Sequence, residues 1–217
     1  MAYNLSDVKV SDADNIARNV EVPAMQNSPL YRTMFPQAAT MTEAQKNEVI
    51  DWYSDMLTDA FLDGAESFLK ACSVDDGSPV GFCGWTAIER KGETTDDERS
   101  KQVLRRATWL PETLDQDGWI TLSRALRMER DRVLKDLGDM ITRLTFMAVR
   151  PGHQRQGVGS MMMQQFCNEA DLHGRCAFVL AAPEGVGLYA RFGFDVVGCV
   201  ESPQGIITSM LRRPRDS

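Results

Sequence analysis

Apolar positions follow two periodicities along this chain. Residues 42–63 carry them at the three- and four-residue spacing of a helix, and Gly64 follows as a stop signal. Residues 5–10, 66–73 and 79–89 are instead short runs typical of strands. An Asp-Gly turn signal at Asp76 separates the last two runs and predicts a hairpin.

The last third of the chain alternates strands and helices. Residues 141–149 and 176–182 suit buried strands, and residues 160–174 between them have a helical pattern. A short helix over 183–193 and two closing strands over 194–201 and 205–211 follow. This order predicts an α/β fold: a central mixed, mostly antiparallel sheet of about seven strands, with helices on both faces.

The segment between these parts differs in composition. Residues 90–101 are almost all polar or charged, which predicts a solvated loop. Pro111 suits the first turn of a helix, which we expect to run in two pieces around Asp117 and Gly118. No internal repeat or long linker interrupts the chain. We therefore expect a single domain over residues 1–217 with an insertion at about 90–140.

Composition and charge exclude several classes of protein. The 217 residues carry a net charge of −7, which argues against broad nucleic-acid binding. No apolar run approaches the ~20 residues of a membrane helix, and no secretory signal is visible. Five widely spaced cysteines and two histidines argue against a disulfide framework or a metal site. We expect a cytoplasmic monomer or homodimer with no metal, membrane or nucleic-acid partner.

The charge is unevenly distributed. Residues 1–140 hold 16 Lys and Arg against 25 Asp and Glu, whereas residues 141–217 hold 8 against 6. The C-terminal third is therefore the better place for an anionic ligand, and the acidic remainder suits a cationic one. Solubility alone is an alternative explanation for the acidic part.

One glycine-containing loop carries the strongest local signal. Residues 154–159 (QRQGVG) follow a predicted strand and open a predicted helix. Glycines let the backbone approach a ligand closely, and a helix N-terminus presents unpaired N–H groups to a phosphate or pyrophosphate. The loop lacks the GKS or GKT of a Walker loop, and Met162 stands where a dinucleotide fingerprint has its third glycine.

Two motifs together resemble a known family. The stretch VRPGHQRQGVG at 149–159 resembles the acetyl-CoA signature of the GNAT N-acetyltransferases, and LYARFGF at 188–194 resembles the family's LY-x-Lys/Arg-x-GF segment. The resemblance covers about residues 141–200. The polar insertion and the Phe35-Pro36 pair look like fungal small-molecule members of the family.

The resemblance implies a sheet that splays between its fourth and fifth strands, with acetyl-CoA as co-substrate in the gap. The strand's free edge would pair with the pantetheine arm, and a backbone N–H near Val149 would polarise the thioester carbonyl. Loop amides would hold the pyrophosphate, and Tyr189 would donate to the departing thiolate. The implied contacts with acetyl-CoA are Phe146, Met147, Ala148, Val149, Gln154, Arg155, Gln156, Gly157, Val158, Gly159, Ser160 and Arg191.

The group that takes the proton from the acceptor amine is left open. Residues 141–149 contain no Glu, Asp or His. Glu184 and Glu201 are the nearest carboxylates in the predicted topology, and a chain of water molecules is an alternative. Candidates for the acceptor site are Tyr31, Phe35, Trp85 and Thr145, although core packing explains the aromatic residues equally well.

The function we predict is transfer of the acetyl group of acetyl-CoA to a primary amine of a small molecule, by direct attack. The insertion before residue 141 favours a covered small-molecule site over the open groove of a protein lysine or N-terminal acetyltransferase. A non-catalytic acyl-CoA sensor and a nucleotide-binding protein are the alternatives from other classes.

Overall fold

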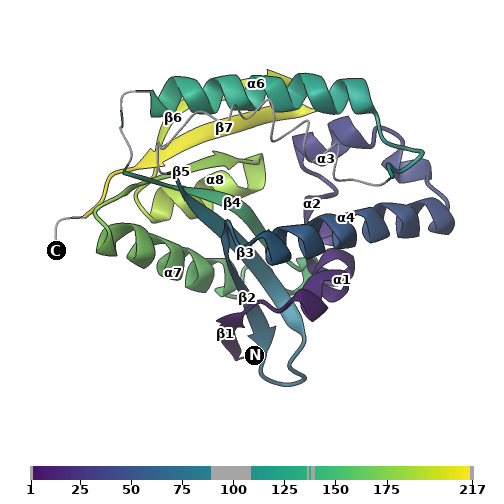
Figure 1. The fold of residues 1–217 in the computed structure, drawn as a ribbon, viewed down its shortest axis with the longest axis horizontal. Helices are drawn as coiled ribbons and strands as arrows, with labels where there is room; N and C mark the ends of the chain where they lie inside the picture. The colour runs from purple at the N-terminus through teal and green to yellow at the C-terminus, as the bar shows by residue number, and fades with distance from the viewer. Residues whose placement is uncertain (1, 89–108, 136, 138–139, 216–217) are drawn as a thin grey trace.

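The computed structural model describes residues 2–88, 109–135, 137 and 140–215. Its centre is a seven-stranded sheet in the order β1-β2-β3-β4-β5-β7-β6 (Figure 1). The strands are β1 (Tyr3–Asp7), β2 (Ser67–Ser73), β3 (Pro79–Ile88), β4 (Ile141–Val149), β5 (Cys176–Ala181), β6 (Asp195–Ser202) and β7 (Gly205–Arg212). Neighbouring strands are antiparallel except for β4 and β5. The predicted mixed, mostly antiparallel sheet is confirmed.

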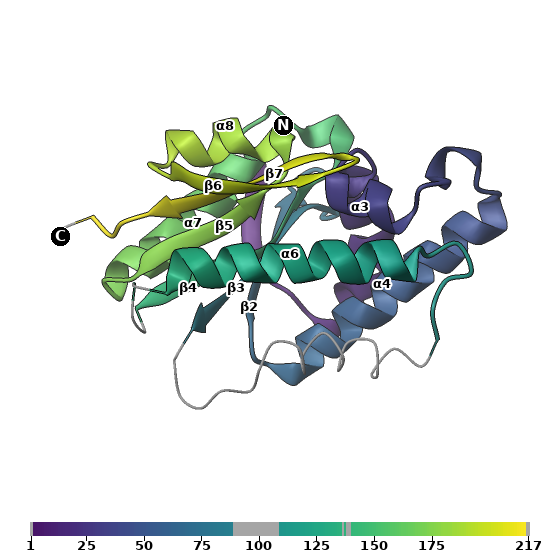
Figure 2. The same cartoon turned by 90° about the horizontal axis from the view of Figure 1, so that it is seen from above.

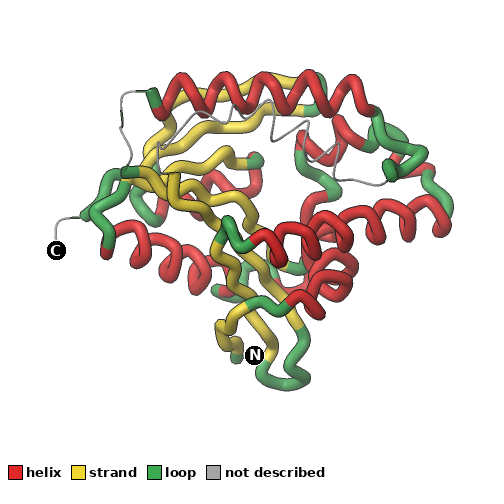
Figure 3. The backbone as a smooth tube through the Cα atoms, viewed as in Figure 1, coloured by secondary structure: helices red, strands yellow, loops and turns green. Residues whose placement is uncertain are grey.

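Helices cover both faces of the sheet (Figures 2 and 3). One face, here called the α6 face, carries α1 (Ala13–Ile16), α2 (Val22–Met25), α3 (Pro29–Met34), α4 (Glu43–Asp63) and α6 (Gln116–Leu134). The other, the α7 face, carries α7 (Val158–Leu172) and α8 (Pro183–Arg191). Short helical segments are η1 (Val10–Asp12), η2 (Ala17–Glu21), η3 (Ala38–Thr40) and η4 (Pro151–His153). Within the described residues, no helix combines the length and the apolarity that a membrane crossing needs.

The ends of α4 follow directly from its sequence. The Thr42 hydroxyl accepts a hydrogen bond from the Gln45 N–H, and the Gln45 side chain accepts one from the Thr42 N–H in return. Gly64 ends the helix in the left-handed conformation at φ 65°, which glycine adopts without steric cost. The predicted helix and its stop are therefore confirmed.

The helix after Pro111 differs from the expectation of two pieces. It is one helix, α6, because Asp115 caps it and accepts a hydrogen bond from the Gly118 N–H at 2.9 Å. Gly118 thus lies in the first turn and causes no break. Along its length, Leu122 of α6 packs with Val200 and Ile207 of the last two strands. The loop expected over 90–101 lies outside the described residues.

Strand β4 separates from β5 soon after it begins. The two strands pair only where Ile141–Arg143 meet Cys176–Phe178. On its other side, β4 stays paired with β3 as far as Val149. Residues 144–149 of β4 therefore have a free backbone edge that faces β5, which is the splay that we predicted between the fourth and fifth strands.

A β-bulge interrupts the alternation of β4. Gly84 of β3 pairs with Phe146 and Trp85 pairs with Leu144, so Thr145 has no opposite residue. The extra residue shifts the side-chain alternation by one. As a result, Phe146 and Ala148 pack in the core of the α6 face, whereas Leu144 and Met147 pack in the core of the α7 face.

Candidate functional site

The free edge of β4 presents backbone hydrogen-bonding groups to the splay. The Arg150 N–H donates to the Val80 carbonyl of β3 at 2.9 Å. In an antiparallel ladder the N–H direction alternates along the strand, so the N–H groups of Met147 and Val149 point away from β3. They point towards the side where β5 has separated. A ligand in extended conformation can therefore pair with this edge as an additional strand would.

The loop after β4 has a backbone that is held in place by its own side chains. The Gln154 amide donates to the Val149 carbonyl at 3.0 Å, and the Gln156 amide donates to the Gly152 carbonyl at 3.0 Å. The Tyr3 hydroxyl of β1 donates to Gln156 Oε1 at 2.6 Å. Arg155 and Gly157 both have positive φ, at 61° and 91°, and a non-glycine residue in that region is uncommon.

Helix α7 begins directly at this loop without a side-chain cap. Its N-cap is Gly157, which has no side chain that could accept from the first N–H groups. Gly159 follows in the first turn, where an added Cβ would lie 3.1 Å from Leu188 Cδ2 of α8. The predicted phosphate residues Gln154 to Ser160 thus lie together at the open end of the splay. Arg155 is exposed there, and Arg191 is exposed in the last turn of α8.

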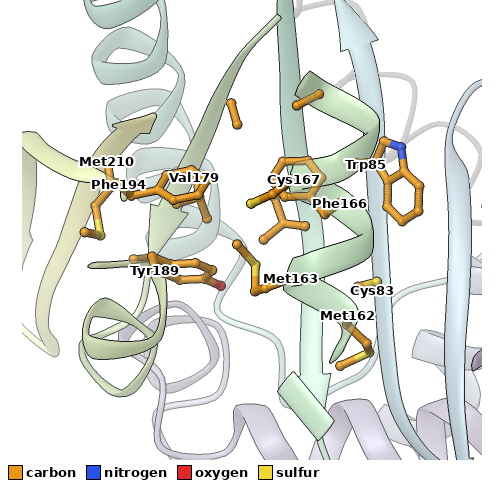
Figure 4. Close-up of a cluster of buried hydrophobic side chains, with 14 of the residues drawn as sticks. Cys83, Trp85, Met162, Met163, Phe166, Cys167, Val179, Tyr189, Phe194 and Met210 are labelled. Atoms are coloured by element: carbon orange, nitrogen blue, oxygen red, sulfur yellow. The ribbon is translucent and has the colours of Figure 1, made fainter. Parts of the chain in front are cut away.

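Tyr189 lies on α8 and points into the core of the α7 face. Figure 4 shows its ring beside Met163 and Phe194, and the ring centroids of Tyr189 and Phe194 are 5.9 Å apart. Gly185 allows this position, because a Cβ there would lie 2.8 Å from Tyr189 Cε2. Burial raises the pKa of the Tyr189 phenol well above its usual range. The hydroxyl therefore stays protonated and can donate a hydrogen bond at physiological pH.

A buried cysteine in the core around Tyr189 is unsuited to nucleophilic attack. Cys83 of β3 is buried in the same core. Burial raises the pKa of its thiol to about 12, so the reactive thiolate is scarce at neutral pH. This favours direct transfer over a covalent thiol mechanism.

The structure separates the two carboxylates that we considered as bases. Glu184 is exposed in the first turn of α8. Glu201 is exposed on the edge strand β6. Its neighbour Val200 packs against α6, so alternation directs Glu201 to the opposite face. Their catalytic roles stay predictions.

The acceptor candidates lie on two different faces. Tyr31 and Phe35 are buried in the core of the α6 face. Thr145 lies at the bulge of β4, and its hydroxyl donates to Glu66 Oε2 at 2.6 Å. Trp85 packs instead on the α7 face, with its ring 6.1 Å from that of Phe166. Along β3, Cys83 and Trp85 lie on the α7 face and Phe82 lies on the α6 face, so regular strand alternation keeps Trp85 away from Tyr31 and Phe35.

Two carboxylates that sequence reasoning missed lie on the α6 face. Glu66 contacts Thr145 as described above, and it precedes β2 by one residue. Glu21 ends the π-helical segment η2 and is only 3% exposed. The sequence signal for Glu21 is an acidic residue between two valines in a helical stretch, and this signal alone does not predict burial.

The comparisons with known proteins agree with this geometry. Residues 118–196 match the family model of the acetyltransferase (GNAT) domain. No curated protein matches the chain.

Solved structures with the same fold include several acetyltransferases. A histone acetyltransferase HPA2 and related acetyltransferase from Corynebacterium glutamicum superposes with a TM-score of 0.62 at 16% identity, over 100% of this chain and 99% of that one. A mosquito arylalkylamine N-acetyltransferase like 5b superposes with a TM-score of 0.62 at 10% identity, over 98% of this chain and 100% of that one. The PaiA N-acetyltransferase from Thermoplasma acidophilum was solved with coenzyme A. It superposes with a TM-score of 0.57 at 11% identity, over 98% of this chain and 99% of that one. At these identities the likeness establishes the fold.

Proposed function

We propose that the chain transfers the acetyl group of acetyl-CoA to a primary amine of a small molecule, because residues 118–196 match the family model of the GNAT acetyltransferase domain. The observation that carries this proposal is the combination of a free β4 edge with an uncapped helix N-terminus at its open end. A molecule with an amide-containing arm and a pyrophosphate matches both features at once.

The residues present fit acetyl-CoA. The outward N–H groups of Met147 and Val149 suit the amides and the thioester carbonyl of the extended arm. The amides of residues 157–160 and the helix dipole suit the pyrophosphate, and Arg155 adds a positive charge there. The neighbour that was solved with coenzyme A supports the same ligand class.

The chemistry needs three contributions from the protein. Acetyl-CoA supplies an activated acetyl group, and the acceptor nitrogen forms a bond to its carbonyl carbon while the C–S bond breaks. A backbone N–H of β4 stabilises the charge that develops on the carbonyl oxygen. Tyr189 donates to the leaving sulfur, and a base removes the proton that the acceptor amine must lose. Glu184 and Glu201 remain candidates for that base beside those of the α6 face.

The acceptor is proposed to be a small molecule because helices wall the α6 face beside the splay. Helix α3 packs against α6 and β7, and α6 itself runs along β6 and β7 (Figure 2). An open groove for a protein chain needs this area to be uncovered. The similarity to an arylalkylamine N-acetyltransferase structure supports a small amine as well.

Calorimetric titration with acetyl-CoA tests the proposed binding site. We expect the wild type to bind and Arg155→Ala to weaken the affinity about fivefold, since an exposed charge contact is worth ~1 kcal/mol. Arg213, exposed just beyond β7, provides the control, and Arg213→Ala should bind as the wild type does. An absence of binding by the wild type would contradict the proposal.

Thiol release tests the transfer step. Acetyl-CoA is offered together with small monoamines, polyamines and lysine or N-terminal peptides. Turnover on small amines supports the proposal, and turnover on peptides alone favours the protein acetyltransferase. Tyr189→Phe should lower kcat about 100-fold and keep the affinity for acetyl-CoA. Binding without turnover on any acceptor would favour a non-catalytic acyl-CoA module.

A further inference from the structure

Glu21 is a buried carboxyl group that the mechanism above does not use. It lies at the C-terminal end of the π-helical segment η2, which interrupts the helix formed by α1 and α2. The residue is 3% exposed, and its Oε2 atom is shielded from solvent without a hydrogen-bond partner. Burial of a carboxyl oxygen without a partner is unfavourable, and π-helical turns often occur at functional sites. Both features are typical of a position that binds a ligand.

Aromatic side chains surround this part of the core. We name Glu21, Tyr31, Phe35, Trp52 and Tyr53 the Glu21 cluster. Tyr31 and Tyr53 stack with ring centroids 6.5 Å apart, and the ring centroids of Trp52 and Tyr53 are 5.3 Å apart. Burial raises the pKa of the Tyr53 phenol, and the nearby charge of Glu21 raises it further. The Trp52 indole nitrogen is a second buried polar atom without a hydrogen-bond partner.

The cluster lies next to the free edge of β4. Segments η2 and α2 both pack against β4 on the α6 face. Phe146 and Ala148 of β4 share one core with the aromatic residues of the cluster. These two residues flank Met147, whose N–H points into the splay. A molecule held beside Glu21 is therefore close to the strand edge at which the thioester is proposed to lie.

We propose that Glu21 binds the ammonium group of the acceptor amine and then takes its proton, and that the acceptor is a small monoamine with an aromatic or apolar body. This inference rests on the proposed function, because it names the substrate class and the proton acceptor of that same site. The rings of Tyr31, Phe35 and Tyr53 offer the apolar walls and the π-faces that attract an organic cation.

The number of charges decides between classes of amine. Among the described residues of this core, Glu21 is the buried acid. It can neutralise one ammonium group, and a second ammonium of a polyamine would be buried without a partner. Glu21 is only 3% exposed. The amine can therefore reach it only if side chains packed against η2 move aside on binding.

The proton step balances within this pair. Burial disfavours both charges, which raises the acid's proton affinity and lowers that of the amine. In the empty site Glu21 is protonated at neutral pH, so binding of the ammonium group releases that proton to solvent, because the opposite charge favours the ionised acid. The ammonium N–H bond then breaks, its proton bonds to a Glu21 oxygen, and the nitrogen keeps the electron pair with which it attacks the acetyl carbon. After transfer, the new amide has no positive charge to hold it beside Glu21. Product release then follows from loss of the ion pair.

The test compares Glu21→Gln with Glu21→Asp and with the control Glu169→Gln. Glu169 is half-exposed on α7 and pairs with His173. Binding of phenethylamine and of spermidine is measured by calorimetry, acetyl-CoA binding is measured in parallel, and thiol release gives kcat and KM. A melting curve for each variant checks the fold. We expect Glu21→Gln to keep acetyl-CoA affinity and to lower kcat/KM for phenethylamine at least 100-fold. Glu21→Asp keeps a carboxyl group and should retain part of the wild-type kcat/KM for phenethylamine.

Each outcome separates this inference from the proposed function. Phenethylamine binding that is lost in Glu21→Gln supports the site, even if acetyl-CoA does not bind and the proposed transfer fails. Unchanged kcat/KM and amine affinity in folded Glu21→Gln would overturn the inference while leaving acetyl transfer intact. Better binding of spermidine than of phenethylamine would overturn the monoamine class. Loss of activity in Glu66→Gln, with Glu21→Gln active, would assign the proton to Glu66 instead.

Discussion

At the scale of single residues, Glu21 makes stability depend on pH. Burial raises the pKa of Glu21 from 4.5 to about 8. The folded chain therefore holds a proton that the unfolded chain releases between these values, so stability falls as the pH rises through this window. Tyr31 and Tyr53 belong to the same cluster, but burial raises the pKa of both phenols above their usual value, so neither titrates in this window.

We expect the wild type to lose roughly 3–4 kcal/mol of unfolding free energy between about pH 5 and about pH 8, at ~1.4 kcal/mol per pH unit. Glu21→Gln removes the titrating proton and should give a flatter profile. Denaturant unfolding of both proteins across this range measures the difference. Parallel profiles for the two proteins would mean that Glu21 titrates as an ordinary exposed acid does.

At the scale of elements, two glycines of α8 provide a matched pair of substitutions. An added Cβ at Gly185 would lie 2.8 Å from the Tyr189 ring, whereas at Gly187 nothing lies within 4 Å. Alanine stabilises a helix interior by about 1 kcal/mol relative to glycine. We expect Gly187→Ala to raise the melting temperature and to keep the activity. Gly185→Ala should displace the Tyr189 ring and lower kcat by about the same factor as Tyr189→Phe.

Melting curves and thiol-release rates of both alanine variants measure these effects. An equal loss of kcat in the two variants would show that α8 needs flexibility itself, rather than a particular position of Tyr189. The comparison is informative because both substitutions make the same chemical change on one helix.

At the scale of the whole molecule, sequence reasoning predicted what short segments determine. The helix that begins after Thr42, the strands of the sheet and the loop that joins β4 to α7 follow from local patterns. The faces of the β4 side chains and the burial of Glu21 do not. The bulge at Thr145 changes which faces the β4 side chains occupy, and it depends on how β3 pairs with β4. Glu21 becomes buried only when α4, β3 and β4, from separate parts of the chain, pack against η2.

One ion pair connects elements that are distant in the chain and holds the two helices of the α7 face to the sheet. Asp171 at the end of α7 accepts two hydrogen bonds from Arg212 of β7, at 2.7 and 2.6 Å. Arg212 is 3% exposed and also donates to the carbonyl of Phe192, which follows α8. The hydrogen bonds from Arg212 lower the pKa of Asp171. The ion pair therefore stabilises the fold at neutral pH, and this stabilisation is lost in acid.

Asp171→Asn leaves the buried guanidinium without its countercharge and should cost about 3–5 kcal/mol of unfolding free energy. Glu43, which pairs with Lys46 on the surface of α4 and has a side chain that is 84% exposed, provides the control. Glu43→Gln should cost less than about 0.5 kcal/mol, since water already solvates both charges. Denaturant unfolding at neutral pH measures both variants. Equal small losses would mean that the sheet holds α7 and α8 through apolar packing alone, and that Arg212 finds other partners when Asp171 is neutral.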